Sequence, residues 1–100
     1  MEENIIGDDK IIISISGDLT VDKAISLRKD LLNYIAKGYN HIVADVTNLD
    51  FIDSTGLGVL VATNKIAHKK NGEVSIKGLK GSIKTIFYNT RLDKVFHICG

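Results

Sequence analysis

The residues best suited to chemistry lie in one short segment, residues 53–58, whose sequence is Asp-Ser-Thr-Gly-Leu-Gly. Phe51 and Ile52 precede it, and an apolar segment with helical spacing follows it to about Lys70. This pattern predicts a helix with Ser54 at its N-cap, beside unpaired backbone N–H groups and the positive end of the helix dipole. Such a point favours an anion, including a phosphate carried by the serine itself. A serine that only caps a helix fits the same pattern, so the rest of the chain has to discriminate between the two interpretations.

Strands and helices that alternate along the chain are expected to position this segment. The Gly7-Asp8-Asp9 turn, between two β-branched runs, predicts an N-terminal hairpin. We expect the further elements to be strands at 10–16, 42–46 and 73–77, helices at 21–37 and 54–70, a short helix from Gly81-Ser82, and a final apolar element at 95–98. The order β-β-α-β-α-β-α-β predicts an α/β fold with a mainly parallel sheet, an N-terminal β-hairpin and about three to four packed helices.

The expected helix at 21–37 follows a break in the chain at Gly17-Asp18-Leu19-Thr20, with Thr20 as a plausible cap. Its apolar stripe comprises Ala24, Leu27, Leu31 and Ile35, widened by Ile25 and Leu32. The segment between 47 and 53 is expected to be a loop. Asp18 and Ser54 both follow the C-terminal ends of strands, so we expect them at the same end of the sheet.

Composition limits the class of protein. One hundred residues form one domain, and 44% apolar with 25% charged residues is typical of a globular protein. No apolar run approaches the ~20 residues that span a membrane, and the acidic N-terminus lacks the features of a signal peptide. Cys99 is the only cysteine, so no internal disulfide can form. These features predict a cytoplasmic protein without a membrane segment.

Several kinds of site are not supported by the sequence. Residues 54–100 hold eight basic and two acidic side chains, but the lysines are scattered and not interleaved with aromatic residues, so we expect no nucleic-acid binding. The three histidines do not stand at metal-ligand spacing with one another or with Cys99, and no cofactor is expected. An aspartic protease would need glycine one position nearer to Asp53. An acyl carrier protein would be all-helical, and the Gly-x-Ser-x-Gly elbow of hydrolases is absent. We therefore expect no catalytic residues.

The segment Phe51–Gly58 resembles the signature of STAS domains, in particular the bacterial anti-sigma factor antagonists. Flanking segments that agree with this family are Gly17-Asp18-Leu19, Ile42–Val46 and Leu92–Ile98. The resemblance covers residues 5–98, and it implies that residues 1–100 form a single STAS domain. Two positions depart from the family pattern: Arg91 stands where the family usually has Gly, and Thr55 stands where many members have a second Ser.

The resemblance implies a function in partner switching, by which transcription is regulated. In the family, the unmodified antagonist binds an anti-sigma factor that is also a serine kinase, and the sigma factor is released. The kinase then phosphorylates the first Ser of the signature, here Ser54, which breaks the complex, and a serine phosphatase restores the binding form. The free protein would be a monomer. The partner-binding residues expected from this resemblance are Asp18, Asp53, Ser54, Thr55, Gly56, Leu57 and Gly58.

Alternatives remain open at this stage. Asp53 could orient the loop for the kinase or only help to cap the helix. Gly56 and Gly58 could admit the partner or pack against the sheet, while the spacing of Leu57 and Leu60 favours the core. The domain could also be a STAS scaffold that is never phosphorylated, such as a stressosome-like component or a small subunit of a transport system. A third interpretation is a module that senses a nucleotide or small ligand at the helix start.

Overall fold

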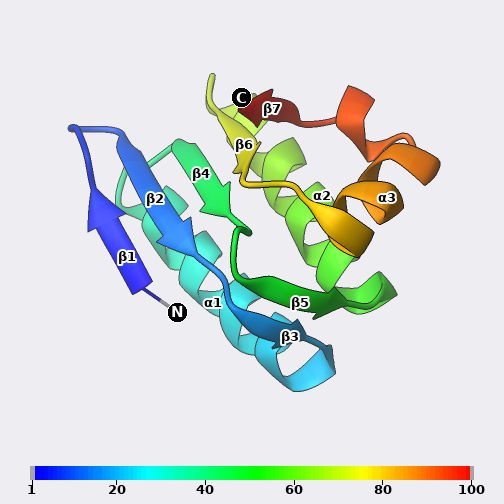
Figure 1. Cartoon of the computed structure of the whole chain (residues 1–100). Helices are drawn as coiled ribbons and strands as arrows, with labels where there is room; N and C mark the ends of the chain where they lie inside the picture. Colours follow the sequence, from blue (N-terminus) through cyan, green and yellow to red (C-terminus); the bar gives the residue numbers. More distant parts are fainter. Residues whose placement is uncertain (1, 100) are drawn as a thin grey trace.

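A computed structural model describes residues 2–99 of the chain, and it shows a five-stranded sheet with helices packed against it (Figure 1). The elements are β1 (Glu2–Ile5), β2 (Lys10–Ser14), β3 (Gly17–Leu19), α1 (Val21–Ala36), β4 (His41–Asp45), β5 (Leu49–Ile52), α2 (Ser54–Lys69), β6 (Glu73–Lys77), α3 (Gly81–Asn89), a 3-10 turn η1 (Leu92–Lys94) and β7 (His97–Cys99). The expected α/β architecture is confirmed.

The main sheet has the strand order β1-β2-β4-β6-β7. β1 pairs antiparallel with β2, as the predicted hairpin requires, and each later pair is parallel. Ile11 and Ile13 of β2 and Ile15 just after it are buried together in the core, while the strand expected at 10–16 ends two residues earlier. Residues 42–44 of β4 are buried without alternation, which confirms a strand covered on both faces. The sheet therefore gives the two long helices α1 and α2 a common apolar surface.

A second, two-stranded parallel sheet forms between β3 and β5. The predictions of a break at 17–20 and a loop at 47–53 are therefore wrong, because both segments contain a strand. β3 has three residues and β5 has four, which is too short for a period of two to emerge from the sequence. Each of the two strands forms because it pairs with the other, although about thirty residues of chain separate them. This small sheet leads directly into the starts of α1 and α2 (Figure 1).

The predicted stripe of α1 is confirmed in its centre and wrong at one flank. Ala24, Leu27, Leu31 and Ile35 are all buried, whereas Ile25 is 62% exposed. Ile25 lies one position beyond the buried row, and no neighbouring element covers that side of the helix at this point. Thr20 precedes the helix in extended conformation, but its side chain makes no capping hydrogen bond.

The C-terminal segment closes the core. The expected short helix is α3, in which Ile83 and Phe87 are buried, and the rings of Phe87 and Phe96 lie 5.9 Å apart. The final strand is His97–Cys99, so the expected element at 95–98 begins two residues too early. Arg91, between α3 and η1, has a φ of 61°, a left-handed conformation that favours glycine. Within residues 2–99, no helix combines the length and the apolar character that crossing a bilayer requires.

Candidate functional site

The start of α2 is organised by Asp53, not by Ser54. Asp53 has the extended backbone of an N-cap, and its Oδ1 accepts a hydrogen bond of 2.9 Å from the Gly56 backbone N–H. The prediction that Ser54 is the N-cap is therefore wrong: Ser54 is the first residue of the helix. Both side chains are good caps, so their types alone could not decide between them. Because Asp53 takes this function, the exposed Ser54 hydroxyl is not needed to cap the helix.

The small sheet brings Asp18 to the same end of the molecule as Ser54, as expected. Asp18 of β3 pairs with Phe51 of β5, and the Asp53 backbone N–H donates to the Leu19 carbonyl oxygen at 3.3 Å. Asp18 is exposed, and the Phe51 side chain is 50% exposed. Phe51 was not expected as a site residue, and only its aromatic type beside the signature could have indicated it.

The two glycines of the signature have different surroundings. A Cβ atom on Gly56 would lie 2.9 Å from the side chains of Ile52 and Leu19 and from the Leu19 carbonyl oxygen. Gly56 therefore allows α2 to pack closely against the small sheet, although its contact with a partner stays a prediction. A Cβ atom on Gly58 would meet nothing within 4 Å. Gly58 is exposed and leaves an open surface one turn after Ser54.

The remaining expected contacts divide between surface and core. Thr55 is exposed beside Ser54, so it offers a second accessible hydroxyl. Leu57 is half-buried and packs against the core, while Leu60 is 1% exposed and belongs to it. The expected core position is thus confirmed for Leu60 and partly for Leu57.

Asn64 holds α2 in place from inside the fold. Its side chain is 4% exposed, and its Oδ1 accepts a 2.8 Å hydrogen bond from the Val74 backbone N–H of β6. Its Nδ2 donates to the Val95 carbonyl oxygen at 3.2 Å. Asn64 stands at helical spacing from Leu57 and Leu60 in the sequence, which gave no indication of these bonds. They connect the helix that carries Ser54 to the main sheet and to the C-terminal turn.

The turn that leads from β4 into β5 is held by Asp45 and Thr47. The Asp45 Oδ1 accepts hydrogen bonds from the Thr47 hydroxyl at 2.6 Å and from the Thr47 backbone N–H at 3.0 Å. The hydroxyl bond is the main reason that the pKa of Asp45 lies below its usual value, against the opposing effect of burial. This turn sets the direction in which β5 enters the signature.

Charge is distributed unevenly around the site. Asp18, Asp22 and Asp50 are exposed at the end of the molecule where the small sheet lies, and Asp53 is partly exposed. The α2 helix contains no acidic residue, and its last turn carries His68 and Lys69. Among the residues 2–99, no group of three or more metal-ligating side chains is present. The site therefore presents exposed hydroxyls, an aromatic ring and several carboxylates, with the Lys23 ammonium held beside β3 by the Ser16 carbonyl oxygen.

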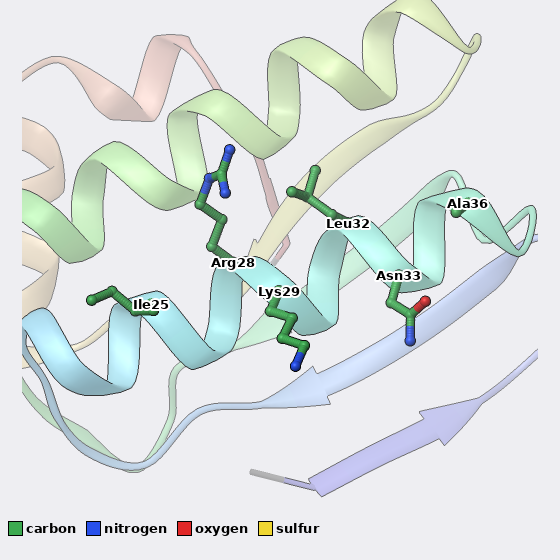
Figure 2. Close-up of a pocket in the computed structure, with 6 residues that line it drawn as sticks. All are labelled: Ile25, Arg28, Lys29, Leu32, Asn33 and Ala36. Carbon is green, nitrogen blue, oxygen red and sulfur yellow. The ribbon is translucent and has the colours of Figure 1, made fainter.

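The exposed side of α1 carries a shallow groove of about 660 Å³ (Figure 2). Another, of about 130 Å³, lies between α3 and β7 and is lined in part by Lys84, Tyr88 and Cys99. Ser54 lines neither of them.

Comparison with known proteins agrees with this arrangement. The STAS domain family model matches residues 3–100. An anti-sigma-B factor antagonist of Staphylococcus epidermidis is 28% identical over 96 residues, which cover 96% of this chain and 89% of the relative. A Thermotoga maritima structure, provisionally assigned as an anti-sigma factor antagonist, has a TM-score of 0.89 at 26% identity and covers 97% of this chain and 83% of its own.

The anti-sigma factor antagonist SpoIIAA of Bacillus shares the fold at lower identity. Its unphosphorylated form has a TM-score of 0.81 at 15% identity, over 99% of this chain and 86% of SpoIIAA. The chain therefore belongs to the STAS domain family, and the Staphylococcus epidermidis relative that matches 96% of its length is named an anti-sigma-B factor antagonist.

Proposed function

We propose that this protein is an anti-sigma factor antagonist whose binding is controlled by phosphorylation of Ser54. In its unmodified form it binds an anti-sigma factor with serine kinase activity, through the surface formed by β3, β5 and the first turns of α2. The kinase transfers a phosphate to Ser54 and the complex dissociates. A serine phosphatase then regenerates the binding form.

The observation that carries this proposal is the separation of two functions at the start of α2. Asp53 caps the helix, so the exposed Ser54 hydroxyl can be modified without loss of the cap. A phosphate at the first helical position lies at the positive end of the dipole, and the folded domain should tolerate it. The solved structures of SpoIIAA in unphosphorylated and phosphorylated forms, with TM-scores of 0.81 and 0.80 to this chain, support a fold compatible with both states.

The same phosphate would be costly inside a complex. It adds close to two negative charges beside Asp53 and near Asp18 and Asp50, on a surface that is already acidic. A partner packed against this surface would have to desolvate those charges. A penalty of about 3 kcal/mol would weaken binding more than a hundredfold. The fold would then survive phosphorylation while the complex would not.

The proposal is tested by pull-down from a lysate of the native cell with four baits: wild type, Ser54→Ala, Ser54→Asp and Ser82→Asp. Ser82 is the matched control, because it is an exposed serine in the first turn of α3, far along the chain from the signature. Wild type, Ser54→Ala and Ser82→Asp should capture a kinase that uses ATP, and Ser54→Asp should not. With ATP, the captured kinase should phosphorylate wild type on Ser54 and leave Thr55 unmodified, as mass spectrometry of the peptide would show.

Other results would replace the proposal. Equal capture of one partner by all four baits would mean that charge at position 54 is irrelevant, as expected for a STAS scaffold. Phosphate found on Thr55 would move the control point by one residue. Calorimetric titration with ATP and GTP of the protein alone should be flat, whereas saturable binding would favour the nucleotide-sensing alternative.

A further inference from the structure

The exposed flank of α1 carries an apolar stripe that the core does not use. Ile25 is 62% exposed, Leu32 is half-buried, and Ala36 is exposed. These residues recur at intervals of seven and four, so they form one continuous row along the helix. Together with Arg28, Lys29 and Asn33 they line the 660 Å³ groove of Figure 2. Arg28 and Leu32 point toward α2, which packs beside α1 (Figure 2).

The charged side chains that line the groove are of one sign, and the two carboxylates of α1, Asp22 and Asp30, are not among its lining residues. Arg28 and Lys29 stand between Ile25 and Leu32, and no carboxylate lines the groove. Among the side chains that the structure describes, neither cation lies within ion-pair distance of an acidic group. The neighbouring helix α2 has no acidic residue that could neutralise them, and it carries Lys65 and Lys69. The groove therefore combines exposed apolar surface with cations that lack a partner inside the described part of the molecule.

We propose that this face of α1 is a second docking surface, whose occupant is an acidic amphipathic helix of a partner protein. An apolar row with intervals of seven and four residues fits the apolar face of another helix. Arg28 and Lys29 select carboxylates beside that face, because charge complementarity favours the partner that neutralises them. The surface is separate from the Ser54 site and does not depend on phosphorylation.

A second copy of this chain fits the groove less well. A two-fold contact through α1 would bring the Arg28 and Lys29 cations of both copies into one interface, where the groove lining offers no carboxylate to pair with them. One flank of a single helix also offers far less than the ~800 Å² per partner of a stable interface. An acidic helix meets neither objection, since its carboxylates pair with the cations and the rest of its interface can lie elsewhere.

The test is an NMR titration of the ¹⁵N-labelled protein with two synthetic amphipathic peptides of about 18 residues, long enough for helix formation. Both carry Leu at helical spacing, one with Glu and the other with Lys beside the apolar row. At low salt the Glu peptide should cause saturable shifts confined to residues 25–36, and the Lys peptide should cause none. Added salt should weaken binding, because the contacts are exposed.

Four variants make the result specific. Arg28→Glu should weaken binding of the Glu peptide about fivefold or more, since an exposed ion pair contributes up to ~1 kcal/mol and reversal adds repulsion. Ile25→Ser should weaken it through loss of apolar contact. Lys10→Glu and Ile5→Ser, at an exposed cation and an exposed apolar residue outside α1, should leave it unchanged. All four positions are exposed, so the fold should persist, as far-UV circular dichroism would verify.

The proposal is overturned by equal binding of the two peptides, by shifts outside α1, or by no saturable shift with the Glu peptide. It is also overturned if sedimentation shows a dimer that Ile25→Ser dissociates, because the face would then be closed by a second copy. None of these results depends on Ser54, so they leave the proposed phosphorylation control untouched.

Discussion

The same substitution should have opposite effects at Gly56 and Gly58, although both lie in the first turns of α2. In a helix Ala is favoured over Gly by about 0.5–1 kcal/mol, and this gain is common to both positions. At Gly58 nothing opposes it, since a Cβ atom would meet no atom within 4 Å. Gly58→Ala should therefore raise the free energy of unfolding by about 0.5–1 kcal/mol.

At Gly56 the added methyl would lie 2.9 Å from the Leu19 carbonyl oxygen, in addition to the Leu19 and Ile52 side chains. That oxygen belongs to the backbone of β3, which is paired with β5, so it cannot rotate away. Overpacking of this kind costs about 1–3 kcal/mol. The gain in helix propensity from Gly to Ala is the same at both positions and cancels in the comparison. Gly58→Ala should therefore be more stable than Gly56→Ala by the same ~1–3 kcal/mol.

The assay is urea unfolding followed by circular dichroism, with thermal melts as a second measure. The denaturant slopes of the two variants should agree, so that a shift in midpoint reports stability alone. For a domain of this size, the difference corresponds to roughly 4–24 °C in Tm. Equal stabilities, or a Gly56→Ala variant at least as stable as Gly58→Ala, would refute the explanation that Gly56 is required for close packing of α2 on the small sheet.

Three further predictions concern single contacts. Asp53→Ala should lower the free energy of unfolding by about 0.5–2 kcal/mol and Asp53→Asn by less, because Asn can still accept the Gly56 N–H; urea unfolding would detect the difference. Arg91→Gly should raise the Tm by a few degrees, since Gly adopts a φ of 61° without the penalty of a Cβ atom, and an unchanged or lower Tm would contradict this. The pKa of Asp45 is lower in the folded than in the unfolded state, so the unfolded state binds more protons near pH 3.8. The contribution of ionised Asp45 to the stability of the fold is therefore complete above that pH and is lost as the pH falls through the folded-state pKa. Thr47→Val should therefore destabilise the protein most near pH 7 and least at the acid end, which unfolding at a series of pH values would measure.

The sequence alone determined the main architecture, because the patterns that specify it are local and long. The buried row of α1 spans about three turns with a period of 3.6, and the uninterrupted apolar run of β4 predicts a strand covered on both faces. The hairpin followed from the turn residues at 7–9. The signature at residues 51–58 indicated the STAS family and Ser54 as the candidate for modification, since it depends on residue types and their order.

Only the tertiary structure decided the details around the site. The β3 and β5 strands form because they pair across a long stretch of chain, and no local alternation of apolar and polar residues predicts them. Which of two adjacent capping residues caps α2 depends on the backbone direction that β5 imposes, and this assigned the cap to Asp53 and left the Ser54 hydroxyl free. Gly56 and Gly58 are the same residue type in one helix, yet one faces the Leu19 backbone and the other faces solvent. Ile25 likewise belongs to the apolar pattern of α1 but lies outside the core, because the surface that covers a side chain comes from other elements of the fold.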